Sequence, residues 1–218
     1  MGKKLTRCFG VLWLAAGIFP GGSPLAAQPA PAASTGTASV PAKAQRPARW
    51  AQRLERPGLP NFFKVSDDLY RGAQPTAEGL KRLAEFKVKT VVNLRTGASD
   101  RKALAGTGME PVELPMDAWR PNEADVVAFL RAAADPQRTP VFVHCRHGAD
   151  RTGMMVAVYR VVVQGWPKEE AVREMTTGGF GYHSVWKRIV KYVRGLDADA
   201  LRRKAGLPAP ASPGGKSE

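Results

Sequence analysis

The sequence predicts an α/β fold in three layers, with a mostly parallel central sheet flanked by helices. Short apolar runs rich in β-branched residues, such as residues 90–94 and 140–143, are typical of buried strands. They alternate with longer segments in which apolar residues recur at helical spacing. Strands that alternate with helices in this way favour parallel pairing, with helices covering both faces of the sheet.

The chain of 218 residues suits one folded domain, predicted over residues 57–205, with extensions at both ends. Residues 1–27 are predicted to be a signal peptide, because a basic start precedes an apolar core over 9–19 that is too short for a comfortable membrane span. Residues 25–27 are the expected small-residue cleavage site. We therefore expect a secreted, periplasmic protein; an uncleaved N-terminal membrane anchor is the alternative.

The segments on either side of the predicted domain lack the apolar residues that offset ordering entropy. Residues 28–56 are rich in Pro and Ala and end in a run of arginines, which predicts a disordered, basic linker. Residues 206–218 are predicted to be a disordered tail. A membrane-surface role for the arginines is one interpretation, and a solvated run of charge is the preferred one. The net charge of +14 fits anionic partners, or equally a role in solubility, and no nucleic-acid recognition motif appears.

The elements are expected in a regular order along the chain. Two short strands surround a Ser-Asp-Asp turn within residues 61–73, and Thr76 caps a helix that runs to about residue 86. Asn122 caps another helix, which runs to about residue 134. The other expected elements are strands over 90–94, 110–116 and 140–143, and helices over 99–106, 154–163, 168–177, 183–194 and 197–204. In the helix over 183–194, Val185, Ile189 and Val193 are predicted to face inward.

One loop carries the chemistry: it follows the strand over 140–143, begins with Cys145 and ends with Arg151. Backbone N–H groups of a turn that leads into a helix converge on one point, so such a loop binds anions. The same field stabilises a cysteine thiolate. Gly148 allows a sharp turn, and Arg151 offers a planar fork to two phosphate oxygens. The loop can therefore hold a phosphate and present a nucleophile to its phosphorus.

The run from His144 to Thr152 matches the signature His-Cys-x-x-Gly-x-x-Arg-[Ser/Thr] of cysteine-dependent protein phosphatases. Over residues 61–194 the chain resembles the atypical dual-specificity phosphatases of plants, fungi and bacteria, with supporting stretches at 69–75 and 91–95. The resemblance implies a protein tyrosine phosphatase-like fold. It also implies phosphomonoester hydrolysis through a phosphocysteine intermediate, which needs neither a metal nor a cofactor.

The loop residues receive individual roles. Cys145 is the expected nucleophile, and His144 is expected to orient the loop from behind. Thr152, by resemblance, helps the thiolate to leave in the second step. The expected phosphate-binding residues are Arg146, His147, Gly148, Ala149, Asp150 and Arg151. Asp150 is unusual in an anion-binding loop, and we expect it to hold Arg151 or a neighbouring backbone group in place.

The leaving oxygen needs a proton, which relatives take from an aspartate on a separate loop. Asp117, just past the strand over 110–116, is the preferred candidate. Glu123 and Asp125 are the alternatives, although both also suit the N-terminus of the next helix. Arg95, at the end of the strand over 90–94, either borders the site or, as the preferred interpretation, is a structural ion-pair partner.

Several functions remain open at this point. The expected substrate is a phosphorylated protein, on tyrosine or on serine and threonine, or a small phosphoester. A phosphoinositide or inositol phosphate is the alternative substrate. A sulfurtransferase also places a cysteine on a loop before a helix, but it needs neither a general acid nor the Arg-Thr-Gly end of the loop. A non-catalytic phosphate-binding module is the third class.

Overall fold

The computed structural model describes residues 46–117 and 121–208. All of them belong to one compact unit. The predicted signal peptide, most of the predicted linker and most of the predicted tail lie outside the described residues. Among the helices of the described residues, none combines the length and the hydropathy of a membrane span.

A six-stranded mixed sheet forms the middle layer, in the order β1-β2-β3-β6-β4-β5. The pairs β3–β6, β6–β4 and β4–β5 are parallel, whereas β1–β2 and β2–β3 are antiparallel. The strands are β1 Gln52–Arg53, β2 Phe63–Lys64, β3 Leu69–Gly72, β4 Thr90–Asn93, β5 Glu110–Glu113 and β6 Val141–His144. The predicted mostly parallel sheet is confirmed.

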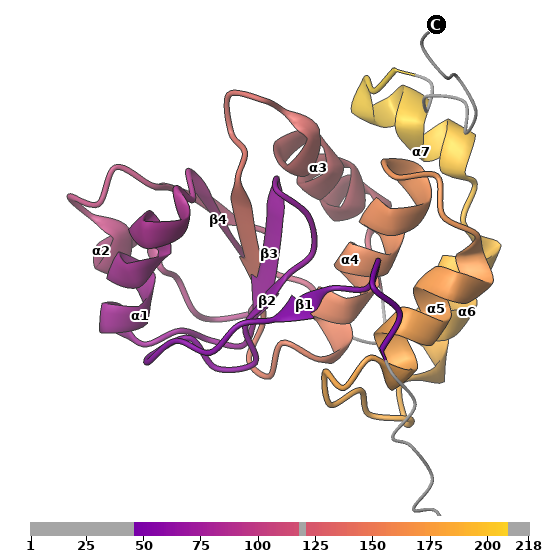
Figure 1. Cartoon of the computed structure of the whole chain (residues 1–218). Coiled ribbons are helices and arrows are strands. Elements are labelled where there is room, and N and C mark those ends of the chain that lie inside the picture. The colour runs from indigo at the N-terminus through magenta and orange to yellow at the C-terminus, as the bar shows by residue number, and fades with distance from the viewer. Residues whose placement is uncertain (1–45, 118–120, 209–218) are drawn as a thin grey trace, which may run out of the picture. The chain divides into compact units, whose positions relative to one another are not determined.

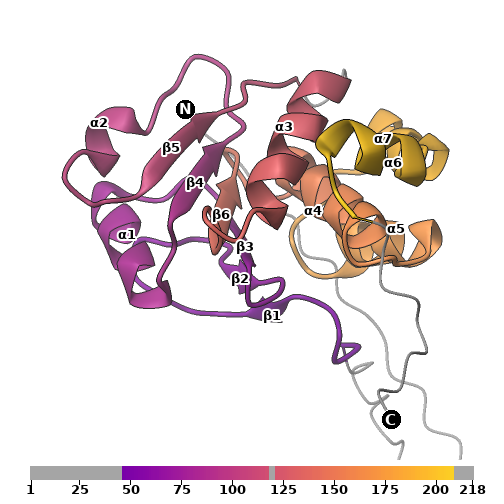
Figure 2. The ribbon, with the colours of Figure 1, turned by 90° about the horizontal axis from the view of Figure 1, so that it is seen from above.

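Helices cover both faces of this sheet, so the predicted three layers are also confirmed (Figure 1, Figure 2). One face carries α1 Ala77–Arg82, the 3₁₀ turn η1 Leu83–Phe86 and α2 Arg101–Leu104. The other face carries α3 Glu123–Ala134, α4 Asp150–Val162, α5 Lys168–Thr177, α6 Lys187–Gly195 and α7 Ala198–Ala205. The side chains of Thr76, Asn122 and Asp197 cap α1, α3 and α7 by accepting hydrogen bonds from backbone N–H groups.

Strand β6 divides the core in two because successive side chains of a strand point to opposite faces. Val141 and Val143 pack in the larger cluster, with α4 and the helices around it. Phe142 packs in the smaller cluster with Leu80 and Leu83. β6 is therefore buried on both faces, and it fixes the start of the loop that follows it.

Helix α4 begins at Asp150, four positions before the predicted start at residue 154. The Arg-Thr-Gly end of the predicted loop thus forms the first turn of the helix, where the Gly153 N–H donates to the carbonyl of Ala149 at 2.9 Å. The helix N-terminus therefore lies directly against the predicted anion-binding loop.

Helix α6 begins at Lys187, so the predicted start at residue 183 is wrong. Ile189 and Val193 are buried as predicted, but Val185 is 72% exposed. Residues 183–186 form a loop because the backbone N–H and the ring of His183 are both bound by Asp150, which lies far away in the sequence.

The folded domain begins before residue 57, which is the start that the sequence predicts. Trp50 and Ala51 are buried, and β1 pairs with β2, so residues 46–56 belong to the domain and not to a disordered linker. The Ala51 N–H donates to Glu174 Oε1 of α5 at 2.6 Å. This contact joins positions 123 apart in sequence, and composition alone does not reveal it.

Candidate active site

A pocket of about 450 Å³ opens where the chain leaves the carboxyl ends of the parallel strands, the usual ligand position in open α/β sheets. Cys145 follows β6, Thr96 follows β4, and Asp117 follows β5. The full lining comprises Thr96, Asp117, Cys145, Arg146, His147, Asp150, Arg151, His183, Val185 and Trp186. Three neighbouring strands and the loop before α6 thus contribute to one site.

Cys145 is a free thiol, 3% exposed, between the end of β6 and the N-terminus of α4. The loop carbonyls that follow it are bound by groups outside the pocket. Gln74 N–H donates to Arg146 O at 3.2 Å, Asn61 Nδ2 to His147 O at 2.9 Å, and Arg71 Nη2 to Gly148 O at 2.6 Å. In a planar trans peptide the C=O and N–H point in opposite directions. The N–H groups of residues 147–149 are therefore turned the other way, as an anion cradle requires.

Gly148 permits this arrangement by lacking a side chain. Its φ is +68°, and a Cβ atom there would lie 2.5 Å from backbone atoms of Gly72 and Ala73. The catalytic loop therefore rests directly on the end of β3. Gly148 and Ala149 are both buried under the pocket, whereas the side chains of Arg146 and His147 are exposed.

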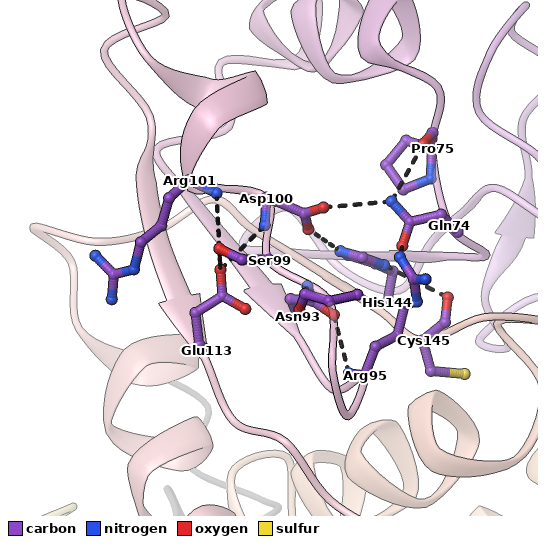
Figure 3. Close-up of polar contacts among 11 residues, drawn as sticks. Gln74, Pro75, Asn93, Arg95, Ser99, Asp100, Arg101, Glu113, His144 and Cys145 are labelled. Atoms are coloured by element: carbon purple, nitrogen blue, oxygen red, sulfur yellow. Dashed lines mark hydrogen bonds and ion pairs between the residues drawn. The ribbon is translucent and has the colours of Figure 1, made fainter.

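His144 lies behind the loop, as predicted, and is fully buried. Its Nε2 lies 2.6 Å from Asp100 Oδ2, and its Nδ1 lies 3.4 Å from the carbonyl of Cys145 (Figure 3). The Cys145 sulfur points away from this pair (Figure 3). Asp100 was not anticipated, since nothing in its local sequence distinguishes it from a helix-capping aspartate.

Asp100 belongs to a polar network that links three strand ends. Its Oδ1 accepts a hydrogen bond from Gln74 Nε2 at 3.3 Å, and its N–H donates to Glu113 Oε1 at 3.1 Å. Burial raises the pKa of Asp100, but the hydrogen bond and charge of His144, with contributions from Gln74 and Arg95, hold the pKa below its ordinary value. Arg95 donates to Gln74 Oε1, so its hydrogen bond within this network is to an amide.

Arg151 spans the pocket from the first turn of α4. Its Nη1 donates to the carbonyls of Leu94 at 3.2 Å and Met116 at 3.3 Å, which follow β4 and β5. These two bonds fix the orientation of Arg151, which lines the same pocket as Cys145 and Asp117. Thr152, the next residue, is fully buried.

Asp150 contacts His183 and not Arg151. Its Oδ1 accepts from the His183 N–H at 2.9 Å, and its Oδ2 lies 2.8 Å from His183 Nδ1. The His183 ring in turn lies 5.7 Å from the ring of His147, centroid to centroid. Asp150 thus anchors the loop before α6, which brings His183, Val185 and Trp186 to the pocket. Sequence reasoning missed these three residues because it placed them in a helix.

Among the candidate acids, Asp117 is the carboxylate that lines the pocket with Cys145 and Arg151. Glu123 instead pairs with Lys204 of α7 at 2.5 Å. Asp125 lies on the first turn of α3 and does not line this pocket. Burial raises the pKa of Asp125. The arrangement therefore favours Asp117 as the proton donor.

Comparison with known proteins gives a consistent result. Residues 59–190 match the family described as DSP-PTPase phosphatase fused to NAD+ kinase. The dual specificity protein phosphatase TpbA of Pseudomonas aeruginosa is 41% identical over 160 residues, which cover 73% of this chain and 72% of TpbA. The inositol diphosphatase DSP5 of Arabidopsis thaliana is 28% identical over 164 residues, covering 68% of this chain and 74% of that protein.

Solved structures agree with these sequence matches. The crystal structure of P. aeruginosa TpbA superposes with a TM-score of 0.66 at 39% identity, covering 74% of this chain and 99% of that one. A second TpbA structure, in complex with pTyr, gives a TM-score of 0.65. With a cysteine, an arginine and an aspartate gathered in one pocket at the strand ends, the chain belongs to the dual-specificity phosphatases, which are cysteine-dependent members of the protein tyrosine phosphatase class.

Proposed function

We propose that this phosphatase hydrolyses phosphotyrosine, and phosphoserine or phosphothreonine, in proteins. The observation that carries the proposal is the shared pocket of Cys145, Arg151 and Asp117. These three side chains supply a nucleophile, an oxyanion-binding fork and a proton donor, which are the groups that phosphomonoester hydrolysis through an enzyme thiolate needs.

In the first step the Cys145 thiolate attacks phosphorus in line with the leaving oxygen. The S–P bond forms as the P–O bond to the leaving group breaks, and Asp117 donates its proton to the departing oxygen. The loop N–H groups and the Arg151 guanidinium bind the equatorial oxygens throughout. In the second step water attacks the phosphocysteine, Asp117 accepts a proton, and inorganic phosphate and the thiolate are released. Thr152 assists this departure.

The rim of the pocket supports an aryl phosphate as one good substrate. Trp186 and the exposed Val185 offer apolar surface beside Cys145. TpbA, which is 39% identical to this chain in its solved form, has been crystallised with pTyr. An inositol diphosphate is the second candidate, because Arg146 and His147 are exposed in the same pocket and DSP5 is similar over 68% of the chain.

A substrate panel tests both candidates. Purified protein is offered a phosphotyrosyl peptide, its phosphoseryl and phosphothreonyl counterparts and an inositol diphosphate, and phosphate release is measured. We expect the highest kcat/KM on the phosphotyrosyl peptide and no release by Cys145→Ser, which should still bind tungstate. Turnover confined to the inositol diphosphate would replace the protein substrate by the second candidate. Full activity of Cys145→Ser would refute the mechanism.

We also propose that residues 1–27 direct export and are removed after Ala27, leaving a periplasmic enzyme. The basic start and short apolar core of that segment support this. N-terminal sequencing of the protein from a periplasmic extract should begin at Gln28. An unprocessed chain in the cytoplasmic fraction would contradict the proposal, and a processed chain that stays with membranes would favour a surface association.

A further inference from the structure

Arg71 of β3 lies beneath the catalytic loop and is fully buried. Its Nη2 donates to the Gly148 carbonyl at 2.6 Å and lies 3.5 Å from the Ala149 carbonyl. The guanidinium rests on the ring of Phe180, with its carbon 3.7 Å from the ring centroid. The side chain thus contacts the loop from the side opposite to the pocket, and nothing in the predicted mechanism uses it.

The positive charge of Arg71 has no ion pair within the described part of the chain. Its Nε and Nη1 are buried without a hydrogen-bond partner there. Glu174 is the carboxylate whose charge acts most on it, but that side chain is bonded to Arg160 at 2.8 Å through each oxygen. A buried cation without an anionic partner is costly, so a nearby anion would stabilise it strongly.

The second negative charge that acts on Arg71 is the one that Cys145 carries as a thiolate. Burial lowers the pKa of Arg71 to about 10, while the negative charges of Glu174 and Cys145 act to raise it. Arg71 therefore remains a cation at neutral pH. The attraction is mutual, because a cation that is favoured by a thiolate favours that thiolate equally. A phosphate held over the loop would gain from the same charge.

We propose that Arg71 is a positioning residue of the active site, which fixes the loop carbonyls from below and supplies a buried positive charge that favours the Cys145 thiolate and the bound phosphate. This rests on the proposed phosphocysteine reaction. Arg71 holds the carbonyls of Gly148 and Ala149. The N–H group that follows each carbonyl, that of Ala149 or Asp150, therefore points away from Arg71. It therefore acts through the backbone and through its field, without touching the substrate.

The test measures how fast iodoacetamide alkylates Cys145 as a function of pH, which reports the thiolate and requires no turnover. Arg71→Met and Arg71→Gln remove the charge, and Arg71→Lys keeps it. We expect both neutral variants to move the alkylation midpoint up by about one pH unit, equivalent to a tenfold loss of thiolate below the midpoint. Arg71→Lys should stay near the wild-type midpoint. The acidic limb of the kcat/KM profile should shift in step with alkylation.

The other charged groups near Cys145 are unchanged in these variants, so they do not account for a shift. They are Asp100 and His144 behind the loop, and Asp117, Arg146, His147, Asp150, Arg151 and His183 around the pocket. Arg53→Met is the matched control, because Arg53 of β1 lies over the ring of Phe63 of β2 and forms no hydrogen bond with the loop among the described residues. It should leave the midpoint unchanged.

A wild-type midpoint in a folded Arg71→Met or Arg71→Gln protein overturns the inference. If neither neutral variant folds, Arg71→Lys decides, because lysine keeps the charge but loses the fork. Arg71→Lys should then bind tungstate about tenfold more weakly than the wild type, and unchanged tungstate binding by this variant would overturn the inference. Alkylation and tungstate binding do not depend on turnover. A protein that shows both effects but hydrolyses no phosphosubstrate would contradict the proposed function alone.

Discussion

Glu174→Gln should destabilise the domain by about 3–5 kcal/mol, because it leaves a buried arginine without its counter-ion. Both carboxylate oxygens bind Arg160 at 2.8 Å, and the two side chains are each 2% exposed. Oε1 also accepts the Ala51 N–H at 2.6 Å. The side-chain amide of a glutamine would direct one of its N–H groups at an N–H donor of Arg160. For a domain of this size the loss corresponds to a fall in Tm on the order of 10 °C.

Urea denaturation followed by tryptophan fluorescence measures this loss by linear extrapolation. Glu169→Gln is the matched control on the same helix, since Glu169 binds Arg194 with two hydrogen bonds of 2.8 Å but is 67% exposed. It should change the unfolding free energy little. The double replacement Arg160→Met with Glu174→Leu should recover part of the stability. A loss below about 1 kcal/mol for Glu174→Gln, within the range of ordinary substitutions, would refute the reasoning.

Three further predictions concern the site. Asp117→Asn should lower kcat about 100-fold on alkyl phosphates and much less on p-nitrophenyl phosphate, since only poor leaving groups need the proton. If Glu123→Gln shows this pattern and Asp117→Asn does not, Glu123 is the acid. Gly148→Ala should abolish turnover and tungstate binding because its Cβ would lie 2.5 Å from β3, whereas Gly97→Ala, also at positive φ but with open space, should keep both. Asp100→Asn should lower the free energy of unfolding, and the loss relative to the wild type should be largest at neutral pH. The pKa of Asp100 is depressed in the folded protein, so its contribution is present above the ordinary aspartate pKa and is lost as the pH falls through the folded value. A stability difference from wild type that grows on acidification would contradict this.

The central part of the site could be predicted because its signals are local. β6, the cysteine loop and α4 follow one another without interruption, and each has a composition that fits its element. The same holds for the helix caps Thr76, Asn122 and Asp197, which act on backbone groups two or three residues away.

The remaining features depend on contacts between distant positions. Val185, Ile189 and Val193 have helical spacing, but the bond between Asp150 and His183 holds residues 183–186 outside the helix. For the same reason the sequence allows two interpretations of Asp150, because its partner His183 lies 33 positions away.

Two other features that the sequence does not predict also depend on contacts between distant positions. A Pro- and Ala-rich composition with many arginines resembles a linker, yet Glu174 binds the backbone of Ala51 and residues 46–56 belong to the folded domain. The bond between Asp100 and His144 spans 44 positions, so no local pattern reveals it. Pairs of this kind emerge only when the sheet is assembled.

The order of the strands also means that the nucleophile and the acid follow strands of different local stability. Cys145 follows β6, which is paired on both sides, whereas Asp117 follows β5, which is the last strand in the order. Amide hydrogens of an inner strand exchange only in large openings, and those of an edge strand exchange in smaller ones. The amides of Val141–His144 should therefore be protected close to the global free energy of unfolding, and those of Glu110, Val112 and Glu113 less so. In mild denaturant, hydrolysis that needs Asp117 is expected to fail while Cys145 still reacts with iodoacetamide as in the native enzyme.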